Sequence, residues 1–146
     1  MEREILFRGI SKETKAMVYG AYFSLHHDDH RTHIHHFIIP ANTPIPKEKP
    51  IGEIQIEVDP TTVGQYTGLC DKDGKKIFEG DILKCVALSN DHHQKGAIVI
   101  SPVEVWEGNA CLSITHTPIY PFCIDHTLTI IGNIHDNPDL AKEESE

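Results

Sequence analysis

Six of the eleven histidines in this chain fall within residues 26–36, its densest group of side chains able to do chemistry. His33 and His35 are two residues apart, so on a strand both side chains would point to the same face. One further ligand from the polar residues before them would complete a zinc or nickel site: His26, His27, Asp28 or His30. The pattern therefore offers His30, His33 and His35 as candidate metal ligands.

A solvated loop that runs into a strand edge explains the same histidines, which would then hold zinc or nickel only adventitiously. A metal site built for function also needs hydrogen-bond partners that fix each imidazole, and the sequence identifies none. We therefore predict no resident cofactor and keep a metal-binding protein or metal-dependent hydrolase as the alternative function.

Two pairs of acidic residues could be metal-binding or catalytic, but a structural role in turns explains each pair better. Asp71 and Asp73 do not match a calcium loop, because a glycine stands at the fourth position instead of the sixth and an isoleucine at the twelfth instead of a glutamate. Glu79 and Asp81 resemble a carboxylate pair, but no second motif supports hydrolysis. We expect Gly80 to bend the chain and Asp81 to accept hydrogen bonds from nearby backbone amides.

Signatures of other reactions are missing from the sequence. The four cysteines form no CxxC pair, which makes a zinc ribbon improbable and favours reduced thiols: Cys70, Cys85, Cys111 and Cys123. There is no GxSxG elbow, no P-loop and no GxGxxG motif. We predict no catalytic residue, and an enzyme is the less favoured reading.

The elements that would position these residues are short strands. Alternating or β-branched runs separated by turn residues predict nine or ten strands and almost no helix, which indicates a mainly β sandwich or small barrels. Residues 3–9 and 17–23 would form an N-terminal hairpin, Pro102 would break one strand into two, and residues 119–123 would be an irregular loop. Residues 137–140 would start a last helical turn.

Residues 63–83 predict two strands joined by a tight turn at Asp71-Lys72-Asp73-Gly74. Their pattern, VGQYTGL…D..G..IFEGDI, resembles the hallmark of the YopX family of phage and prophage proteins. The segments REILFRG near the N-terminus and IIGNIHDNPDL near the C-terminus resemble the same family. The distinctive positions in the hairpin are Gly64, Tyr66, Gly68, Asp71, Gly74, Glu79, Gly80 and Asp81.

The resemblance implies a mainly β protein of phage or prophage origin and supplies no activity. It also implies an SH3-like small barrel after the GDI motif. We accordingly expect an N-terminal β-rich subdomain at residues 1–65, an SH3-like β-barrel subdomain at residues 66–137 and a C-terminal tail at residues 138–146.

The charge and hydropathy limit the partners. The formal net charge of −9 disfavours nucleic acid, although four lysines could form a local basic patch: Lys72, Lys75, Lys76 and Lys84. Three aromatic residues would line a groove or, as we prefer, pack in the core: Trp106, Tyr120 and Phe122. No run of 18 apolar residues is present and the chain starts with charged residues, so we expect a cytoplasmic protein in a bacterial host.

These observations favour a non-enzymatic accessory or regulatory binding module. Its partner would be an unidentified host or phage macromolecule, and the protein would form a homo-oligomer. A nucleic-acid-binding barrel is the second alternative.

Overall fold

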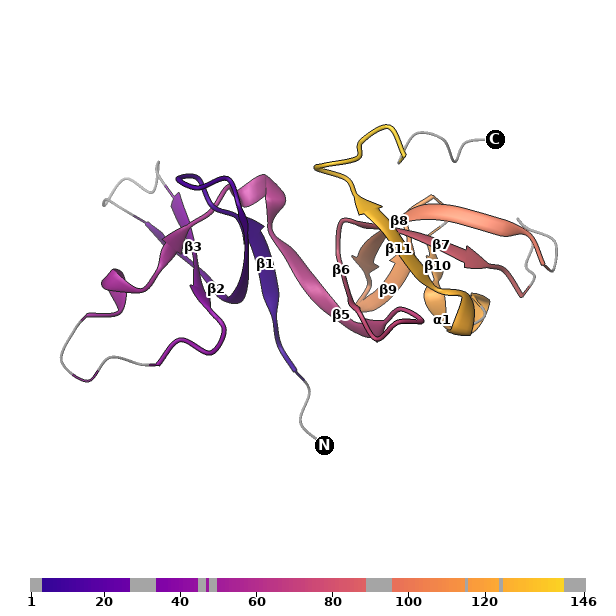
Figure 1. Cartoon of the computed structure of the whole chain (residues 1–146), viewed down its shortest axis with the longest axis horizontal. Coiled ribbons are helices and arrows are strands. Elements are labelled where there is room, and N and C mark those ends of the chain that lie inside the picture. The colour runs from indigo at the N-terminus through magenta and orange to yellow at the C-terminus, as the bar shows by residue number, and fades with distance from the viewer. Residues whose placement is uncertain are drawn as a thin grey trace. The chain divides into compact units, whose positions relative to one another are not determined.

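The structure is a computed structural model that describes residues 4–26, 34–44, 47, 50–88, 96–114, 116–123 and 125–140. The chain divides into two compact units, Met1–Gln65 and Tyr66–Glu146. Both are built from antiparallel strands, which confirms the predicted mainly β class with many short strands (Figure 1).

The first unit is an antiparallel sheet with the order β4-β3-β2-β1. Its strands are β1 (Phe7–Ile10), β2 (Met17–His26), β3 (Ile34–Pro40) and β4 (Ile56–Glu57). β1 and β2 form the N-terminal hairpin, which begins four residues later than predicted because residues 4–6 are not in a strand. Two short 3-10 helices follow, η1 (Ile51–Glu53) and η2 (Pro60–Thr62).

The centre of the first unit is formed by Ile38 and Val58, whose side chains are fully buried. Gly9 lies directly beneath them, because a methyl group added there would meet Val58 and Ile38 at 3.2–3.3 Å. Asp59 accepts a hydrogen bond from the Thr61 amide and caps η2, as its position before Pro60 predicts.

Strand β5 (Gly64–Cys70) leads from the first unit into the second. Gly64 and Gln65 pair with β1, while Tyr66 and Cys70 pair with β6 (Lys76–Phe78).

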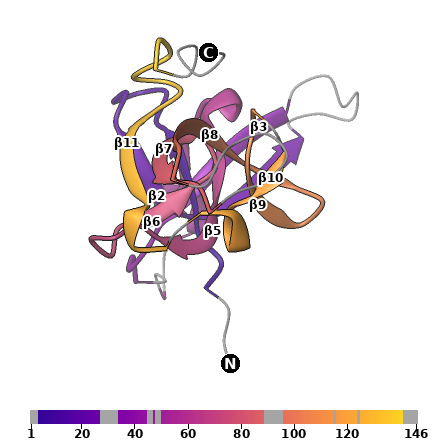
Figure 2. The same ribbon diagram turned by 90° about the vertical axis from the view of Figure 1, so that its right-hand side faces the viewer.

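The second unit contains a five-stranded antiparallel sheet with the order β10-β9-β8-β7-β11. Its strands are β7 (Asp81–Val86), β8 (Ile98–Trp106), β9 (Asn109–Leu112), β10 (Thr117–Pro118) and β11 (Thr129–Asn133). β11 lies beside β7 in both ribbon views (Figures 1 and 2). Among the described residues no ladder joins β10 to β11, so the SH3-like barrel stays a prediction.

The core of the second unit is one apolar cluster beneath this sheet. Its fully buried centre consists of Ile77, Leu83, Ala87, Leu112, Ile119 and Leu128. Two cysteines, Cys85 and Cys123, belong to the same cluster.

One expectation for the second unit is wrong. Pro102 does not break a strand, because β8 pairs with β7 up to Pro102 and with β9 from Val103 onward. The proline stands where the strand changes its main partner, at a place where its missing amide is tolerated. The segment 119–123, expected to be irregular, holds only a short helical turn, α1 (Ile119–Phe122), which is interrupted by the extended backbone of Tyr120.

Two smaller differences concern element lengths. β4 contains two residues, although residues 54–58 alternate in sequence. Residues 138–140 form a turn held by the Leu140 amide and the Asn137 carbonyl at 3.1 Å, and no helix is present there.

Candidate binding groove and the motif residues

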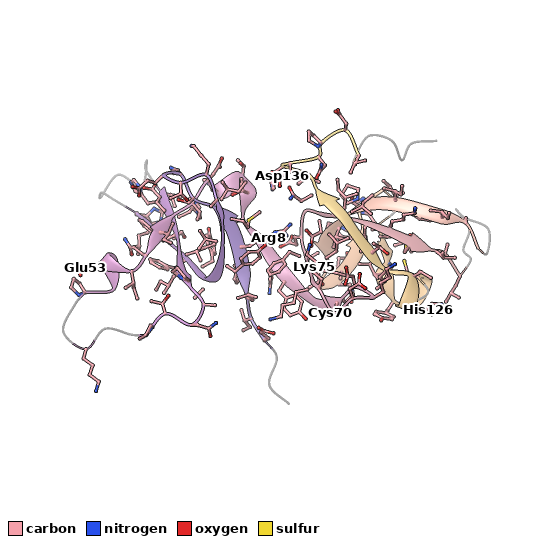
Figure 3. All side chains as sticks on the ribbon, viewed as in Figure 1. Arg8, Glu53, Cys70, Lys75, His126 and Asp136 are labelled. Atoms are coloured by element: carbon pink, nitrogen blue, oxygen red, sulfur yellow. The ribbon has the colours of Figure 1, made fainter. Side chains whose placement is uncertain are left out.

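The hairpin between β5 and β6 is closed by Asp71. Its Oδ1 accepts hydrogen bonds from the amides of Asp73 and Lys75, both at 2.9 Å. Its own amide donates to the Lys75 carbonyl, and Gly74 takes a φ of +82°. Figure 3 labels Cys70 and Lys75 on the two sides of this turn. Asp71 therefore closes the turn through both its side chain and its own amide.

Glu79 and Gly80 form the next turn, and Asp81 begins β7. Asp81 is 3% exposed, and its Oδ2 accepts a hydrogen bond from the Phe78 amide at 2.8 Å. Since Glu79 stands in the turn, it does not share a strand face with Asp81. The two carboxylates thus lack the arrangement that a catalytic pair on one strand requires.

Tyr66 packs between the side chains of the hairpin. Its ring lies 5.6 Å from that of Phe78, and the Lys76 ammonium lies 5.5 Å above it. Gly68 has a φ of +88° where the β5–β6 register shifts, and Gly64 is buried opposite Arg8. These positions serve packing and chain direction.

The hairpin and the C-terminal motif meet in space. Lys72 donates from its amide to the Leu128 carbonyl at 2.8 Å, and β7 pairs with β11 along its first half. The Ile134 amide donates to the Gly80 carbonyl at 2.8 Å. Two segments about 50 residues apart in sequence thus form one structural unit around β7 and β11.

An open groove is lined by residues of β7, β8 and β11 together with Lys72 of the hairpin and Thr127. It has a volume of about 320 Å³ and is lined by Lys72, Lys84, Cys85, Val86, Ile98, Thr127, Thr129 and Ile131. Ile98 is 65% exposed, the largest exposed fraction among the apolar side chains of the second unit that the structure describes. Two cationic side chains thus border an apolar floor with two hydroxyl groups.

The groove brings together two of the four lysines that the sequence offered as a basic patch. Lys72 and Lys84 line it, whereas Lys76 lies over the Tyr66 ring and Lys75 stands in the hairpin turn. The sequence analysis missed Ile98, Thr127 and Thr129, which come from β8, from the segment before β11 and from β11, and carry no motif. The exposed position of Ile98 opposite Val86 becomes visible only once β7 and β8 are paired.

Two of the three aromatic residues, Trp106 and Tyr120, are not in the core as preferred from sequence. Trp106 is 46% exposed and Tyr120 is 45% exposed, while the side chain of Phe122 lies outside the described residues. The rings of Trp106 and His116 lie 5.0 Å apart in a tilted arrangement, and His116 contacts the Glu104 carboxylate. The end of β8 therefore carries an exposed aromatic surface.

Of the candidate metal ligands His30, His33 and His35, only His35 is placed, because the other two lie outside the described residues. The Nδ1 atom of His35 lies 3.1 Å from Glu57 Oε2, and Lys12 contacts the same oxygen at 3.0 Å. The hydrogen bond from His35, followed by that from Lys12, lowers the pKa of Glu57 below its ordinary value. His26 and His35 line a second open pocket of about 370 Å³ with Leu25, Phe37 and Gln55.

No group of three potential metal ligands comes together among the residues placed by the structure. His36 has a different partner, since its Nδ1 lies 2.5 Å from the Tyr22 hydroxyl. A metal site would therefore need ligands from the histidines between β2 and β3.

The comparisons with known proteins agree with the motif residues. The family described as YopX protein matches residues 6–142, so this chain belongs to the YopX family, as its three motifs indicate. Among solved structures, it is similar to protein EF1440 from Enterococcus faecalis, with 26% identity over 96% of this chain and 99% of that chain and a TM-score of 0.49. No curated protein matches.

Within the part of the chain described by the structure, none of the helices has the length and apolar character needed to cross a bilayer.

Proposed function

We propose that this protein is a non-enzymatic binding module of phage or prophage origin that acts in the cytoplasm of a bacterial host. Its second unit, with an SH3-like barrel, holds an acidic and partly apolar segment of a partner protein in the groove between Lys72, Lys84 and Ile98. The observation that carries the proposal is the exposure of Ile98 beside two lysines on a sheet face.

The chemistry of the groove selects the partner. A half-exposed apolar floor gains free energy when a partner covers it, at roughly 25 cal/mol per Å² of apolar surface. Lys72 and Lys84 make the border of the groove positive, whereas the net charge of the chain is −9. An acidic segment is therefore attracted to the groove and repelled by the rest of the surface. A volume of about 320 Å³ is small for a ligand pocket, which suits a few side chains of a partner.

The test is capture from bacterial host extract followed by measurement with purified components. Wild-type protein, Lys84→Glu and Ile98→Asp are compared, with Lys75→Glu as the charge-matched control outside the groove. We expect Lys84→Glu and Ile98→Asp each to weaken the purified complex at least tenfold in calorimetry, while Lys75→Glu binds as wild type. A partner that both groove variants bind with unchanged affinity would overturn the proposal.

The same variants test the other partners. Sedimentation shows whether the protein is a homo-oligomer and whether Ile98→Asp dissociates it, in which case a second copy occupies the groove. A mobility-shift assay at low salt tests nucleic acid, and we expect no shift at micromolar protein because the chain is strongly acidic.

The contact between Glu57 and His35 favours metal binding as a second candidate function. A carboxylate that holds one ring nitrogen is the usual support of a metal-binding histidine, and it directs coordination to Nε2. Elemental analysis of protein purified without a histidine tag tests this function. The variants are His35→Ala and Glu57→Gln. The control is His126→Ala, since His126 lies on η3 (Asp125–Thr127) and is labelled in Figure 3. Metal binding is supported if the wild type and His126→Ala hold stoichiometric metal and both His35→Ala and Glu57→Gln lose it. Less than a tenth of an equivalent of metal in the wild type excludes this function.

A further inference from the structure

Two buried thiols lie in contact within the core of the second unit. The sulfur atoms of Cys85 and Cys123 are 2.8 Å apart, although the residues are 38 positions apart in the chain. Cys85 is 1% exposed and Cys123 is 3% exposed. A disulfide bond is about 2.05 Å long, so the two sulfurs need to approach by less than one ångström.

The backbone holds this pair in place from both sides. Cys85 stands in β7 opposite Val99, and Cys123 forms an isolated bridge with Ala87, the residue directly after the end of β7. The Cys123 amide also donates to the Ile119 carbonyl at 2.8 Å, which ties Cys123 to α1. The close approach therefore follows from two sheet contacts and does not depend on a side-chain rotamer alone.

The two thiols have different environments. The hydrogen bond from the Cys123 thiol lowers the pKa of Cys85, and the same bond together with burial raises the pKa of Cys123. Cys85 also lines the open groove beside Lys72 and Lys84, whereas Cys123 does not. Of the two sulfurs only that of Cys85 borders the groove, so we expect a disulfide reagent to react with Cys85 first.

We propose that Cys85 and Cys123 are a redox-active thiol pair, which a low-molecular-weight disulfide oxidises to an intramolecular disulfide that staples β7 to the segment after α1. The Cys85 thiolate attacks one sulfur of the reagent, forms a mixed disulfide and releases one thiolate. The Cys123 sulfur then loses its proton, attacks Cys85 Sγ and expels the second thiolate. The two protein thiols lose two electrons and two protons, and the reagent becomes two thiols.

The other two cysteines provide internal controls. Cys70 is exposed on the β5–β6 hairpin, and Cys111 is buried in β9, where burial, followed by the charge of Glu104, raises its pKa. Cys70 is expected to take up the reagent as a stable mixed disulfide, because no other described cysteine is close to it. Cys111 is expected to stay reduced.

The test uses the full chain treated with oxidised glutathione, then alkylated and digested without reductant. We expect a disulfide-linked peptide pair that contains Cys85 and Cys123. In the double variant Cys70→Ser/Cys111→Ser, the oxidised protein should be lighter than the reduced protein by the mass of two hydrogen atoms. Thermal unfolding of that variant should shift upward on oxidation and return after dithiothreitol, because the cross-link restricts the unfolded chain.

The single variants distinguish the two sulfurs. Cys123→Ser should accumulate glutathione on Cys85, whereas Cys85→Ser should leave Cys123 a free thiol. Peptide maps of wild type that join other cysteines, or that show glutathione on Cys70 with both Cys85 and Cys123 alkylated, overturn the proposal. The wild-type map decides the outcome even where a serine variant does not fold.

Discussion

A single buried carboxylate fixes the start of β7. Asp81 is almost fully buried and accepts a hydrogen bond from the Phe78 amide, so it closes the turn that contains Glu79 and Gly80. A buried charge persists only where hydrogen bonds compensate its desolvation. The conspicuous acidic residues of the family motif therefore stabilise turns, and their spacing reflects turn geometry.

Removal of this side chain should cost stability without changing the fold. Asp81→Ala removes the carboxylate that accepts from the Phe78 amide, which costs about 1–3 kcal/mol in the free energy of unfolding. Asp81→Asn keeps an acceptor oxygen and should lose less. Urea denaturation at neutral pH measures both, with exposed Asp139→Ala as the control expected to stay near wild type. An Asp81→Ala variant as stable as wild type contradicts the assignment.

In the C-terminal motif, the side chain of Asn137 packs closely against the Cα of Gly132. A methyl group added at Gly132 would meet Asn137 Oδ1, the atom that accepts a hydrogen bond from the Asn133 amide at 3.3 Å. Gly132→Ala should therefore displace Asn137 and cost about 0.5–1.5 kcal/mol, the usual net worth of one hydrogen bond. A double-mutant cycle by urea denaturation checks this: in an Asn137→Ala background the glycine change should cost less, because only the Asn137 Cβ, 3.2 Å from the added methyl group, remains. Additive effects of the two substitutions would exclude the contact.

The contact between Glu57 and His35 predicts how acid affects the first unit. The folded pKa of Glu57 is lowered, so its contribution to stability is present above the ordinary value of 4.5 and is lost as pH falls through the lowered value. Glu57→Gln should remove this part of the acid sensitivity, and the effect should be small because the pair is partly exposed. Urea midpoints at pH 7 and pH 3.5 for both proteins measure it. Equal losses of stability in both would refute the coupling.

At the scale of elements, strands were predictable where the pattern is local. The hairpins β1–β2 and β5–β6 follow from alternation and from the Asp71–Gly74 turn, and the short helix η2 follows from Asp59 and Pro60. Prediction failed at Pro102 because a long-range change of strand partner overrides the local preference of proline. It failed for the groove because Lys72, Ile98 and Thr129 come from three segments that only the sheet brings together.

Gly80 joins two elements and should tolerate no larger residue. It has a φ of +88°, its amide donates to the Val103 carbonyl and its carbonyl accepts from the Ile134 amide. A β-branched residue in this conformation is strained by about 1–3 kcal/mol, and we expect Gly80→Val to lose at least that much stability. Thermal unfolding compares it with Gly52→Ala, where an added methyl group meets nothing within 4 Å. Undiminished stability of Gly80→Val would show that the turn is adaptable.

At the scale of the whole molecule, each unit has its own buried centre. Ile38 and Val58 fill that of the first unit, while Leu112 belongs to the cluster of the second. Strand β5 is the covalent link, since its first residues pair with β1 and its later residues with β6. Such an arrangement permits one unit to open while the other stays folded.

This independence gives a prediction that involves the full chain. Ile38→Ala and Leu112→Ala each remove a fully buried side chain and should each cost about 2–5 kcal/mol in their own unit. Hydrogen exchange followed by mass spectrometry should then show faster exchange in residues 7–40 for Ile38→Ala and in residues 81–112 for Leu112→Ala, with the other unit unchanged. Faster exchange throughout the chain in both variants would mean that the two units unfold as one cooperative structure. In that case a ligand bound in the groove of the second unit would stabilise the first unit as well.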